Sequence, residues 1–294
     1  MKKVLVIVGP TGVGKSSFAI ECAKKFNGEI ISGDSIQVYK GLDIGSAKIK
    51  KTEANKIVHH LIDIKEPNET YSVKEFQELA RLKINEVLSR NKLPIICGGT
   101  GLYIKALIYD YKFNDEETKD DQFENMSNEE IYNEIKKVDP DSLNKIHINN
   151  RKRLVRALNI IKKNHTSITE IKNKQEHIPI YNAKLIGLTR NKDLLVDLVD
   201  KRIDQMIKDG LLEEITGLLN AGVSFDNQSM QAIGYKEFKD YFNKTKSKEQ
   251  CIEDIKTHTH QFIKRQYTWF NNQMNVEWYD DNELASKAIE RWYE

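Results

Sequence analysis

Residues 1–20 read MKKVLVIVGPTGVGKSSFAI, and this stretch decides the fold class. Val4 to Val8 form a continuous apolar run rich in β-branched residues, which is typical of a strand buried on both faces. Gly9 to Ser16 then match the phosphate-binding pattern G-x-x-x-x-G-K-[ST]. Ser17 to Phe26 have the pattern of a helix, which we expect to end at Gly28. A glycine-rich loop between a buried strand and a helix is the context that this motif requires, so the stretch predicts a P-loop.

A P-loop binds phosphate mainly through its backbone. Successive N–H groups point into one concavity, and the N-terminus of the following helix adds a partial positive charge. We expect Lys15 to reach the outer phosphates as a point charge and Ser16 to place its hydroxyl on Mg²⁺. The predicted phosphate-binding residues are Gly9, Pro10, Thr11, Gly12, Val13, Gly14, Lys15 and Ser16.

Further strands alternate with helices along the chain. Short β-rich runs at Glu29–Ser32, Ile95–Cys97 and Leu185–Thr189 are expected strands, and Ser72 with Glu75 predicts a capping box at the start of a helix. Alternation of this kind favours a parallel sheet. The sequence therefore predicts an α/β fold, with a P-loop NTPase-like parallel sheet flanked by helices.

The middle of the chain differs from the rest. Residues 112–177 contain helical patterns and no convincing strand, so we interpret them as a helical insertion domain that divides a core made of residues 1–111 and 178–294. Charge is segregated inside the insertion: Asp115 to Glu134 hold nine acidic residues and one lysine, and Arg151 to Lys174 hold eight basic residues and one acid. These runs are either two solvated helix faces or, for the basic one, a footprint for a phosphate backbone.

Composition excludes several classes of protein. The chain has 294 residues, 39% of them hydrophobic and 31% charged, as in an ordinary globular protein. Lys and Arg number 46 against 44 Asp and Glu, so net charge alone does not indicate nucleic-acid binding. No apolar run approaches the ~18 residues that cross a bilayer, and we expect no membrane partner. Three widely spaced cysteines without metal-ligand spacing indicate reduced thiols in a cytoplasmic protein.

Two polar segments follow expected strands at their carboxyl ends. Asp34 comes just after Glu29–Ser32, and Gly98 to Thr100 follow Ile95–Cys97. Because the carboxyl ends of parallel strands form the rim of the ligand crevice, these residues and the P-loop are expected to share one rim. A carboxylate at this place can accept a proton from an incoming nucleophile, or Asp34 simply shapes a turn.

A metal-binding carboxylate of the kind that nucleotide-hydrolysing enzymes use is hard to find. Such an acid usually stands at the end of a buried strand. The strand at Ile95–Cys97 ends in glycine, and the apolar run before Asp63 is short. The sequence thus predicts a polyphosphate site with little support for nucleotide hydrolysis.

Several longer motifs carry a resemblance to a known family. Besides the P-loop, the chain contains GDSIQVYKGLDIGSAK (Gly33 to Lys48), PIICGGTGLYIKAL (Pro94 to Leu107), QAIGYKE (Gln231 to Glu237) and IKRQYTWF (Ile263 to Phe270). In this order they resemble the bacterial tRNA dimethylallyltransferase (tRNA isopentenyltransferase) family nearly from end to end. The resemblance implies transfer of a dimethylallyl group from dimethylallyl diphosphate to N6 of the adenosine immediately 3′ of the anticodon in tRNA.

The resemblance also implies roles for individual residues. The P-loop holds the diphosphate with Mg²⁺, and Lys15 stabilises the charge that builds on the leaving group. Asp34 is the base that orients and deprotonates the adenine amine, and Thr100 hydrogen-bonds near the diphosphate and the reacting nitrogen. Arg202 clamps the leaving group, although the sequence alone favours an exposed charge on an amphipathic helix at this position.

The target base has to leave the stacked anticodon loop to reach the site. By resemblance, the tRNA-binding residues are Asp34, Ser35, Ile36, Gln37 and Thr100 around the base, with Lys152, Arg153, Leu154, Val155, Arg156, Gln231, Ala232, Ile233, Gly234, Tyr235 and Lys236 along the anticodon stem-loop. Lys264, Arg265 and Trp269 are candidates for further phosphate and stacking contacts. Six positions depart from the family pattern, namely Ser46, Ile49, Lys192, Leu198, His260 and Asn271.

Two other functions remain open from the residues themselves. A small-molecule or nucleotide kinase also uses a P-loop and an acid after the second strand, and Arg151 to Arg156 could imitate its lid. A nucleotide-dependent switch bound to RNA is the other, although no convincing N-K-x-D motif for guanine is present. For the transferase that the resemblance implies, we expect a monomer.

Overall fold

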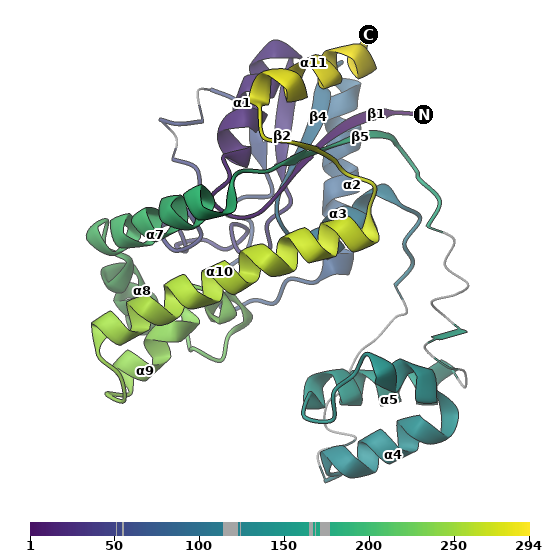
Figure 1. Cartoon of the computed structure of the whole chain (residues 1–294), viewed down its shortest axis with the longest axis vertical. Coiled ribbons are helices and arrows are strands. Elements are labelled where there is room, and N and C mark those ends of the chain that lie inside the picture. The colour runs from purple at the N-terminus through teal and green to yellow at the C-terminus, as the bar shows by residue number, and fades with distance from the viewer. Residues whose placement is uncertain are drawn as a thin grey trace. The chain divides into compact units, whose positions relative to one another are not determined.

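Figure 1 presents the computed structural model, in which six parallel strands form one sheet within the described part of the chain. The strand order is β3 (His59–His60), β2 (Gly28–Ser32), β4 (Leu93–Cys97), β1 (Lys3–Val8), β5 (Asn182–Leu188) and β6 (Glu277–Tyr279). Every pair of neighbours is parallel, with Leu5 opposite Ile95 on one side of β1 and opposite Lys184 on the other. The predicted α/β fold class is therefore confirmed.

The structure describes residues 1–50, 52–54, 56–113, 123, 125–164, 167, 169–170 and 177–294. It divides the chain into two compact units, which are described separately. Unit 1 comprises Met1–Tyr109 and Pro179–Glu294, and unit 2 comprises Asp110–Ile178. These limits lie close to the boundaries that we expected for the insertion.

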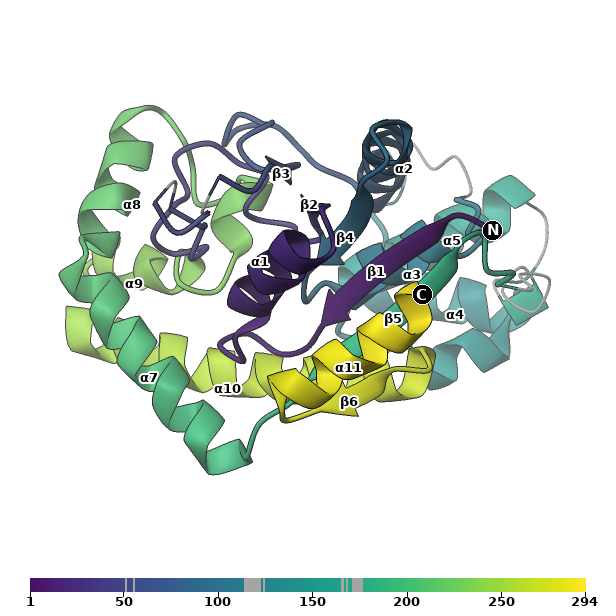
Figure 2. The same cartoon turned by 90° about the horizontal axis from the view of Figure 1, so that it is seen from above.

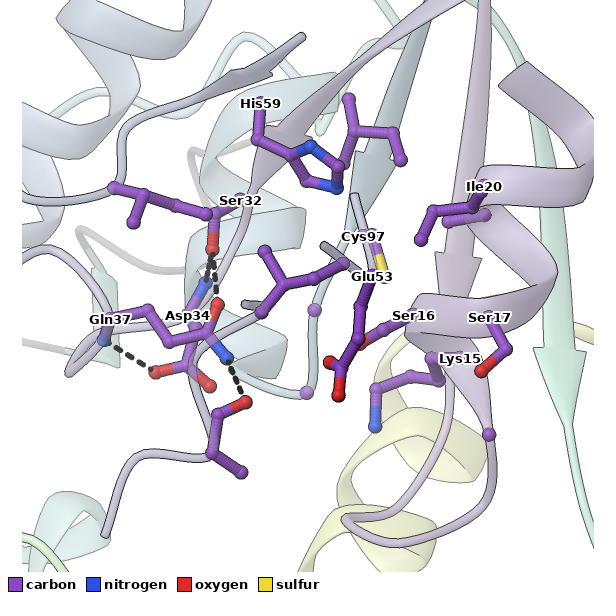
Figure 3. Close-up of a pocket in the computed structure, with 18 of the residues that line it drawn as sticks. Lys15, Ser16, Ser17, Ile20, Ser32, Asp34, Gln37, Glu53, His59 and Cys97 are labelled. Atoms are coloured by element: carbon purple, nitrogen blue, oxygen red, sulfur yellow. Dashed lines mark hydrogen bonds between the residues drawn. The ribbon is translucent and has the colours of Figure 1, made fainter. Parts of the chain in front are cut away.

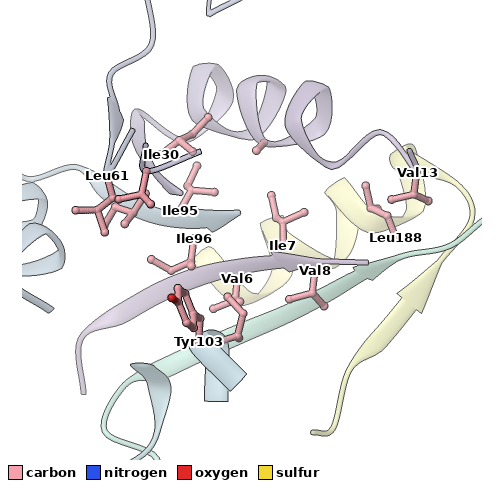
Figure 4. Packing of buried hydrophobic residues seen from close by; sticks show 14 of the residues in the cluster. Val6, Ile7, Val8, Val13, Ile30, Leu61, Ile95, Ile96, Tyr103 and Leu188 are labelled. Carbon is pink, nitrogen blue, oxygen red and sulfur yellow. The ribbon is translucent and has the colours of Figure 1, made fainter. Parts of the chain in front are cut away.

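The central strand is buried on both faces, as its apolar run predicts. None of the side chains from Val4 to Val8 is exposed. Ile7 faces α1 (Lys15–Lys25), whereas Val6 and Val8 face the side of Tyr103 on α3 (Gly101–Ile108), as Figure 4 shows. Helix α2 (Val73–Ser89) packs on α3 and on β2 and β4. Two layers of helices thus enclose the sheet and fix where its strands end.

Helices from the second half of unit 1 gather at the side to which the strands point (Figure 2). These are α7 (Lys192–Lys208), α8 (Leu211–Asn220), α9 (Lys239–Phe242) and the long α10 (Lys248–Gln273), which contacts both α7 and α3. Two short 3₁₀ turns, Gln228–Gln231 and Lys236–Phe238, lie between α8 and α9. The C-terminal α11 (Asn282–Tyr293) packs on β5 and β6.

The boundaries around Gly28 differ from those expected. Helix α1 begins at Lys15 and ends at Lys25, capped by Phe26, and Asn27 makes the turn with a φ of +50°. Gly28 is instead the first residue of β2, where a Cβ would lie 2.9 Å from the carbonyl oxygen of Leu93. Glycine is required there by close packing between strands, and the expected role in ending the helix is corrected.

Other strand predictions were incomplete. β5 begins at Asn182, earlier than expected, because it pairs with the full length of β1. β3 and β6 are two and three residues long, too short to give a periodic signal in the sequence.

The capping box expected at the start of α2 also differs. Ser72 accepts the N–H of Glu75, but the Glu75 carboxylate pairs with Lys65 at 2.8 Å. The expected capping box is therefore only half formed.

Unit 2 is helical and has its own hydrophobic core. It contains α4 (Asn128–Val138), a 3₁₀ turn at Pro140–Asn144 and α5 (Arg151–Asn164), with no strand among its described residues. Leu154 and Val155 are buried in this core, so their assignment as tRNA contacts is corrected. Lys152, Arg153 and Arg156 on the same helix are exposed. Much of the acidic run, and the last part of the basic run, lie outside the described residues.

Candidate active site

The P-loop has the backbone that its glycines predict. Gly12 and Gly14 have φ angles of +80° and +103°, in the region that favours glycine. A Cβ on Gly9 would lie 2.5 Å from the carbonyl oxygen of Leu188, and one on Gly12 would lie 2.5 Å from Val199. Larger residues at these two positions would displace a strand or α7, so the loop is shaped by its own sequence and by tight packing.

Lys15 lies at the start of α1, with its ammonium group among the loop residues (Figure 3). The Nζ donates to the carbonyl oxygen of Pro10 at 2.7 Å. Burial lowers the pKa of Lys15 to about 8, although Cys97 and Asp34 act in the opposite direction. Because burial makes the charged form of Lys15 costly, this position favours an anionic ligand beside the ammonium group.

Two neighbouring cavities of about 500 Å³ each open at the carboxyl ends of the strands. The first is lined by the P-loop, Ser16, Ile30 and His59, and the second by Thr100, Phe262 and Arg265. The residues that line both cavities are Thr11, Lys15, Asp34, Ser46, Ala47, Gly99 and Arg202. The expected rim is confirmed, because the P-loop, Asp34 and the glycines after β4 meet at this junction.

Asp34 shapes a turn and also faces the junction. Its Oδ1 accepts the N–H groups of Ile36 (2.8 Å) and Gln37 (3.2 Å). Its Oδ2 has no hydrogen-bond partner among the described residues, and the side chain lines both cavities. One oxygen thus fixes the turn and the other is left for a ligand, and the role of Asp34 as a base stays a prediction.

Arg202 is not the exposed helix charge that its sequence allows. It lines both cavities from α7, and burial lowers its pKa, with Asp34 and Glu53 acting in the opposite direction. With Lys15 it places two cations and one carboxylate at the junction. The two cations suit an anionic ligand, and the carboxylate suits a second group, next to that ligand, that has a proton to lose.

Gln37 lines the first cavity and is also hydrogen-bonded within the protein. Its Oε1 accepts the hydroxyl of Ser32 at 3.2 Å, and its Nε2 donates to the carbonyl oxygens of Ser46 (3.3 Å) and Ala47 (3.4 Å). Ser35 and Ile36 line the second cavity but not the first. Gln37 therefore links the turn at Asp34 to the loop at the junction.

Thr100 occupies the N-cap position of α3, yet its hydroxyl makes no capping bond, and the residue lines the second cavity.

The neighbouring Gly99 is held by Gln266, a residue that we did not single out from the sequence. Gln266 on α10 accepts the N–H of Thr11 at 3.0 Å and donates to the carbonyl oxygen of Gly99 at 3.1 Å. This buried amide connects the P-loop to the segment that follows β4. Its position within the motif IKRQYTWF was the one signal in the sequence that could have identified it.

Residues 231–236 form one wall of the second cavity. Gln231, Ala232, Ile233, Gly234 and Lys236 line it, as a contact with RNA would require. Tyr235 is fully buried, and its hydroxyl donates to Glu214 at 2.7 Å. Its assignment as a tRNA contact is corrected to a supporting role behind the wall.

Trp269 and the unusual residues of α10 make contacts inside the protein. A Cβ on Gly101 would lie 2.0 Å from the ring of Trp269, so this ring packs against the start of α3. His260 pairs with Asp200 at 2.7 Å, and Asn271 accepts the indole N–H of Trp278 at 2.9 Å. Where the family resemblance implies arginine, these two residues hold neighbouring elements together.

Ser16 supplies the clearest candidate metal ligand in the first cavity, which Asp34 and Glu53 also line. Ser16 lines the first cavity beside Lys15, where a hydroxyl and phosphate oxygens suit Mg²⁺. Asp63, the candidate acid of a nucleotide-hydrolysing site, pairs with Lys48 at 2.6 Å instead. Among the described residues there is no group of three His, Cys, Asp or Glu that could hold a metal. The kinase alternative therefore loses Asp63, the metal-binding acid that the sequence offered for it.

The sequence model of the IPP transferase family matches residues 37–273. The chain belongs to this family. It is 49% identical to the tRNA dimethylallyltransferase of Anoxybacillus flavithermus over 282 residues, which cover 95% of this chain and 90% of that protein. It is 46% identical to the Bacillus pumilus enzyme of the same name, over 94% of this chain and 89% of the relative.

Solved structures of family members share the fold. The tRNA delta(2)-isopentenylpyrophosphate transferase of Staphylococcus epidermidis matches with a TM-score of 0.74 and 39% identity, covering 99% of this chain and all of that one (100%). A eukaryotic dimethylallyltransferase acting on tRNA matches with a TM-score of 0.83 and 31% identity, covering 95% of this chain and 73% of that chain. The fold of this family member is thus shared between bacterial and eukaryotic transferases.

Proposed function

We propose that this protein transfers a dimethylallyl group from dimethylallyl diphosphate to N6 of the adenosine immediately 3′ of the anticodon in tRNA. Membership of the IPP transferase family supports the reaction class. The observation that carries the proposal is the junction itself, where Lys15, Arg202 and Asp34 line both cavities. One cavity then receives the diphosphate and the other the base, and the reacting atoms meet between them.

The leaving group takes its charge at the P-loop. As the bond between the allylic carbon and the diphosphate oxygen breaks, its electron pair stays on the diphosphate. Backbone N–H groups of the P-loop between Gly12 and Ser16, the Lys15 ammonium and the Arg202 guanidinium are placed to stabilise that charge. Burial of both cations strengthens their interaction with an anion, because the surroundings screen charge less than water does.

Asp34 is the proposed base. The exocyclic amine of adenine forms the new C–N bond and must lose one proton, which passes to Oδ2 of Asp34. The backbone bonds to Oδ1 hold the carboxylate in place while this happens. Thr100, with a hydroxyl unused by α3, is the proposed hydrogen-bonding group beside the reacting nitrogen.

Mg²⁺ is the proposed cofactor, held by the Ser16 hydroxyl and the diphosphate oxygens. When bound, it would neutralise charge on the diphosphate and so assist its departure. The roles of Lys15, Arg202 and Asp34 derived above do not depend on it.

The proposed RNA partner is the tRNA anticodon stem-loop. Residues 231–236 offer an open wall of the second cavity for the flipped base, and exposed cations on α5 suit the phosphate backbone. We further propose a monomer that works in the cytoplasm. No helix in the described part of the chain is both long and apolar enough to cross a membrane.

The test uses the purified protein, an anticodon stem-loop with an unmodified adenosine, and radiolabelled dimethylallyl diphosphate, without ATP. We expect label to move to the RNA, and to be lost when the target adenosine is replaced by inosine, which has no exocyclic amine. ATP-dependent phosphorylation of a small molecule without RNA labelling would reject the proposal in favour of a kinase.

A further inference from the structure

The loop at residues 43–47 has no helix or strand, yet a single side chain holds its first half. The carboxylate of Glu214, on α8, accepts three consecutive backbone N–H groups, those of Asp43 (2.9 Å), Ile44 (2.7 Å) and Gly45 (3.3 Å). The next two residues, Ser46 and Ala47, line both cavities at the junction. A residue outside the two cavities thus determines where this part of their wall lies.

Tyr235 completes the arrangement from the opposite wall. Its hydroxyl donates to Oε1 of Glu214 at 2.7 Å, and its ring packs so closely on Gly45 that a Cβ there would lie 2.5 Å away. Tyr235 is fully buried and belongs to the 231–236 stretch, whose other members line the second cavity. Glu214 and Tyr235 therefore connect two walls of that cavity that are far apart in the sequence.

We propose that Glu214 and Tyr235 are positioning residues for the transfer reaction, holding the 43–47 loop and the 231–236 stretch at a fixed separation around the RNA base. This inference rests on the function proposed above. Neither side chain takes part in the chemistry. They act by keeping Ser46 and Ala47 beside Lys15 and Asp34, so that the base enters in reach of the carboxylate.

The hydrogen-bond pattern around Glu214 supplies a sharp test. All four of its partners are donors: three N–H groups and one hydroxyl. An ionised carboxylate only accepts, so it satisfies all of them. The Glu214→Gln side chain has nearly the same shape but must turn an NH₂ group toward other donors. Glu213, the neighbouring exposed carboxylate, gives the matched control variant Glu213→Gln.

The experiment combines hydrogen–deuterium exchange with kinetics on the full chain. In Glu214→Gln we expect amides 43–45 to exchange at least about tenfold faster, while the P-loop amides and the Kd for inorganic diphosphate stay unchanged. With RNA, we expect kcat/KM for the stem-loop to fall by about 10- to 100-fold, since small misplacement of reacting groups has effects of that size. Glu213→Gln should match the wild type in every measurement.

Tyr235→Phe removes one donor and should lower kcat/KM for the stem-loop by about threefold to tenfold. Because the glutamine NH₂ then meets one donor fewer, the double variant should be no worse than Glu214→Gln alone. Losses that multiply, unchanged kinetics in Glu214→Gln, or a parallel loss of diphosphate binding would each overturn the inference. If the wild type transfers no label, the proposed function fails, while the exchange rates at 43–45 still decide whether Glu214 holds the loop.

Discussion

The two loops that meet at the junction are built in opposite ways. The P-loop, residues 9–16, takes its shape from its own glycines between β1 and α1. The 43–47 loop takes its shape from distant side chains, with Glu214 on its N–H groups and Gln37 on its carbonyl oxygens. In the proposed reaction, the diphosphate would thus be bound by a local motif, whereas the position of the RNA base would depend on Glu214 and Gln37, which lie outside the loop that they hold.

The largest expected effect is at Asp34, where the two loops face each other. Asp34→Asn keeps an oxygen for the N–H groups of Ile36 and Gln37, so the turn should survive, but it cannot take a proton. We expect kcat to fall by about 10²- to 10⁴-fold, the usual contribution of a general base. Single-turnover transfer, together with Kd values for diphosphate and for the stem-loop, measures this.

Asp226→Asn, at an exposed carboxylate that pairs with Lys239, is the control and should be active. If Asp34→Asn instead weakened stem-loop binding as much as turnover, Asp34 would be a structural turn residue and the base would have to be sought elsewhere.

The next effect concerns Gln266, which joins the locally built loop to the end of β4. Gln266→Leu removes the acceptor for the Thr11 N–H and the donor to the Gly99 carbonyl oxygen. The P-loop would keep its own geometry but shift relative to Thr100, so we expect kcat/KM to fall by about 10- to 100-fold. Gln261→Leu, on the exposed face of the same helix, should have no effect. Full activity in Gln266→Leu would show that the P-loop needs no outside support.

Glu214 and Gln266 show which parts of the site could not be predicted from the sequence. The fold class and the shared rim follow from local signals, because a buried β-run, a glycine-rich loop and an Asp after a strand each have meaning in isolation. No local pattern of this kind surrounds Glu214 or Gln266. A glutamate or glutamine on an amphipathic helix is normally interpreted as a solvated side chain, and only the folded structure shows which segment it contacts. The mistaken contacts, such as Tyr235 and Leu154, arose in the same way, because matching a motif does not show which face of it is buried.

A smaller effect is expected from pH. Burial lowers the pKa of Lys15 to about 8, and a bound diphosphate should raise it again. Binding therefore takes up a proton above pH 8, and affinity for inorganic diphosphate should fall as pH rises from 8 to 9, by several-fold and at most about tenfold per pH unit. Below about pH 7 Lys15 is charged in both states and adds no pH dependence.

Lys15→Arg is the matched variant for this titration. Its guanidinium stays charged over the whole range, so the remaining slope is that of diphosphate itself. Calorimetry in buffers of different ionisation enthalpy would count the protons directly. Equal proton uptake by both proteins at pH 8.5 would mean that Lys15 does not titrate there.

The smallest effect on catalysis is expected at Glu29, a buried carboxylate on β2 outside both cavities. Burial alone would raise its pKa, but hydrogen bonds from Arg90, Lys92 and His60 outweigh this and lower it to about 2. Because the folded-state pKa lies below the unfolded value, Glu29 stabilises the protein above about pH 4.5, and this contribution is lost as pH falls toward 2.

Glu29→Gln should therefore lower the thermal midpoint at pH 7 and leave kcat within about twofold at a temperature where the variant is folded. Loss of one partner in a buried charge network typically destabilises by about 3–5 kcal/mol, and the difference between the two proteins should shrink between pH 4.5 and 2.5. Glu66→Gln, at a surface carboxylate paired with Lys40, should change the midpoint little at any pH. If Glu29→Gln impaired transfer as strongly as Gln266→Leu, a charge network outside both cavities would be setting the geometry of the junction. Side chains that stabilise the sheet could then no longer be distinguished from side chains that position the site.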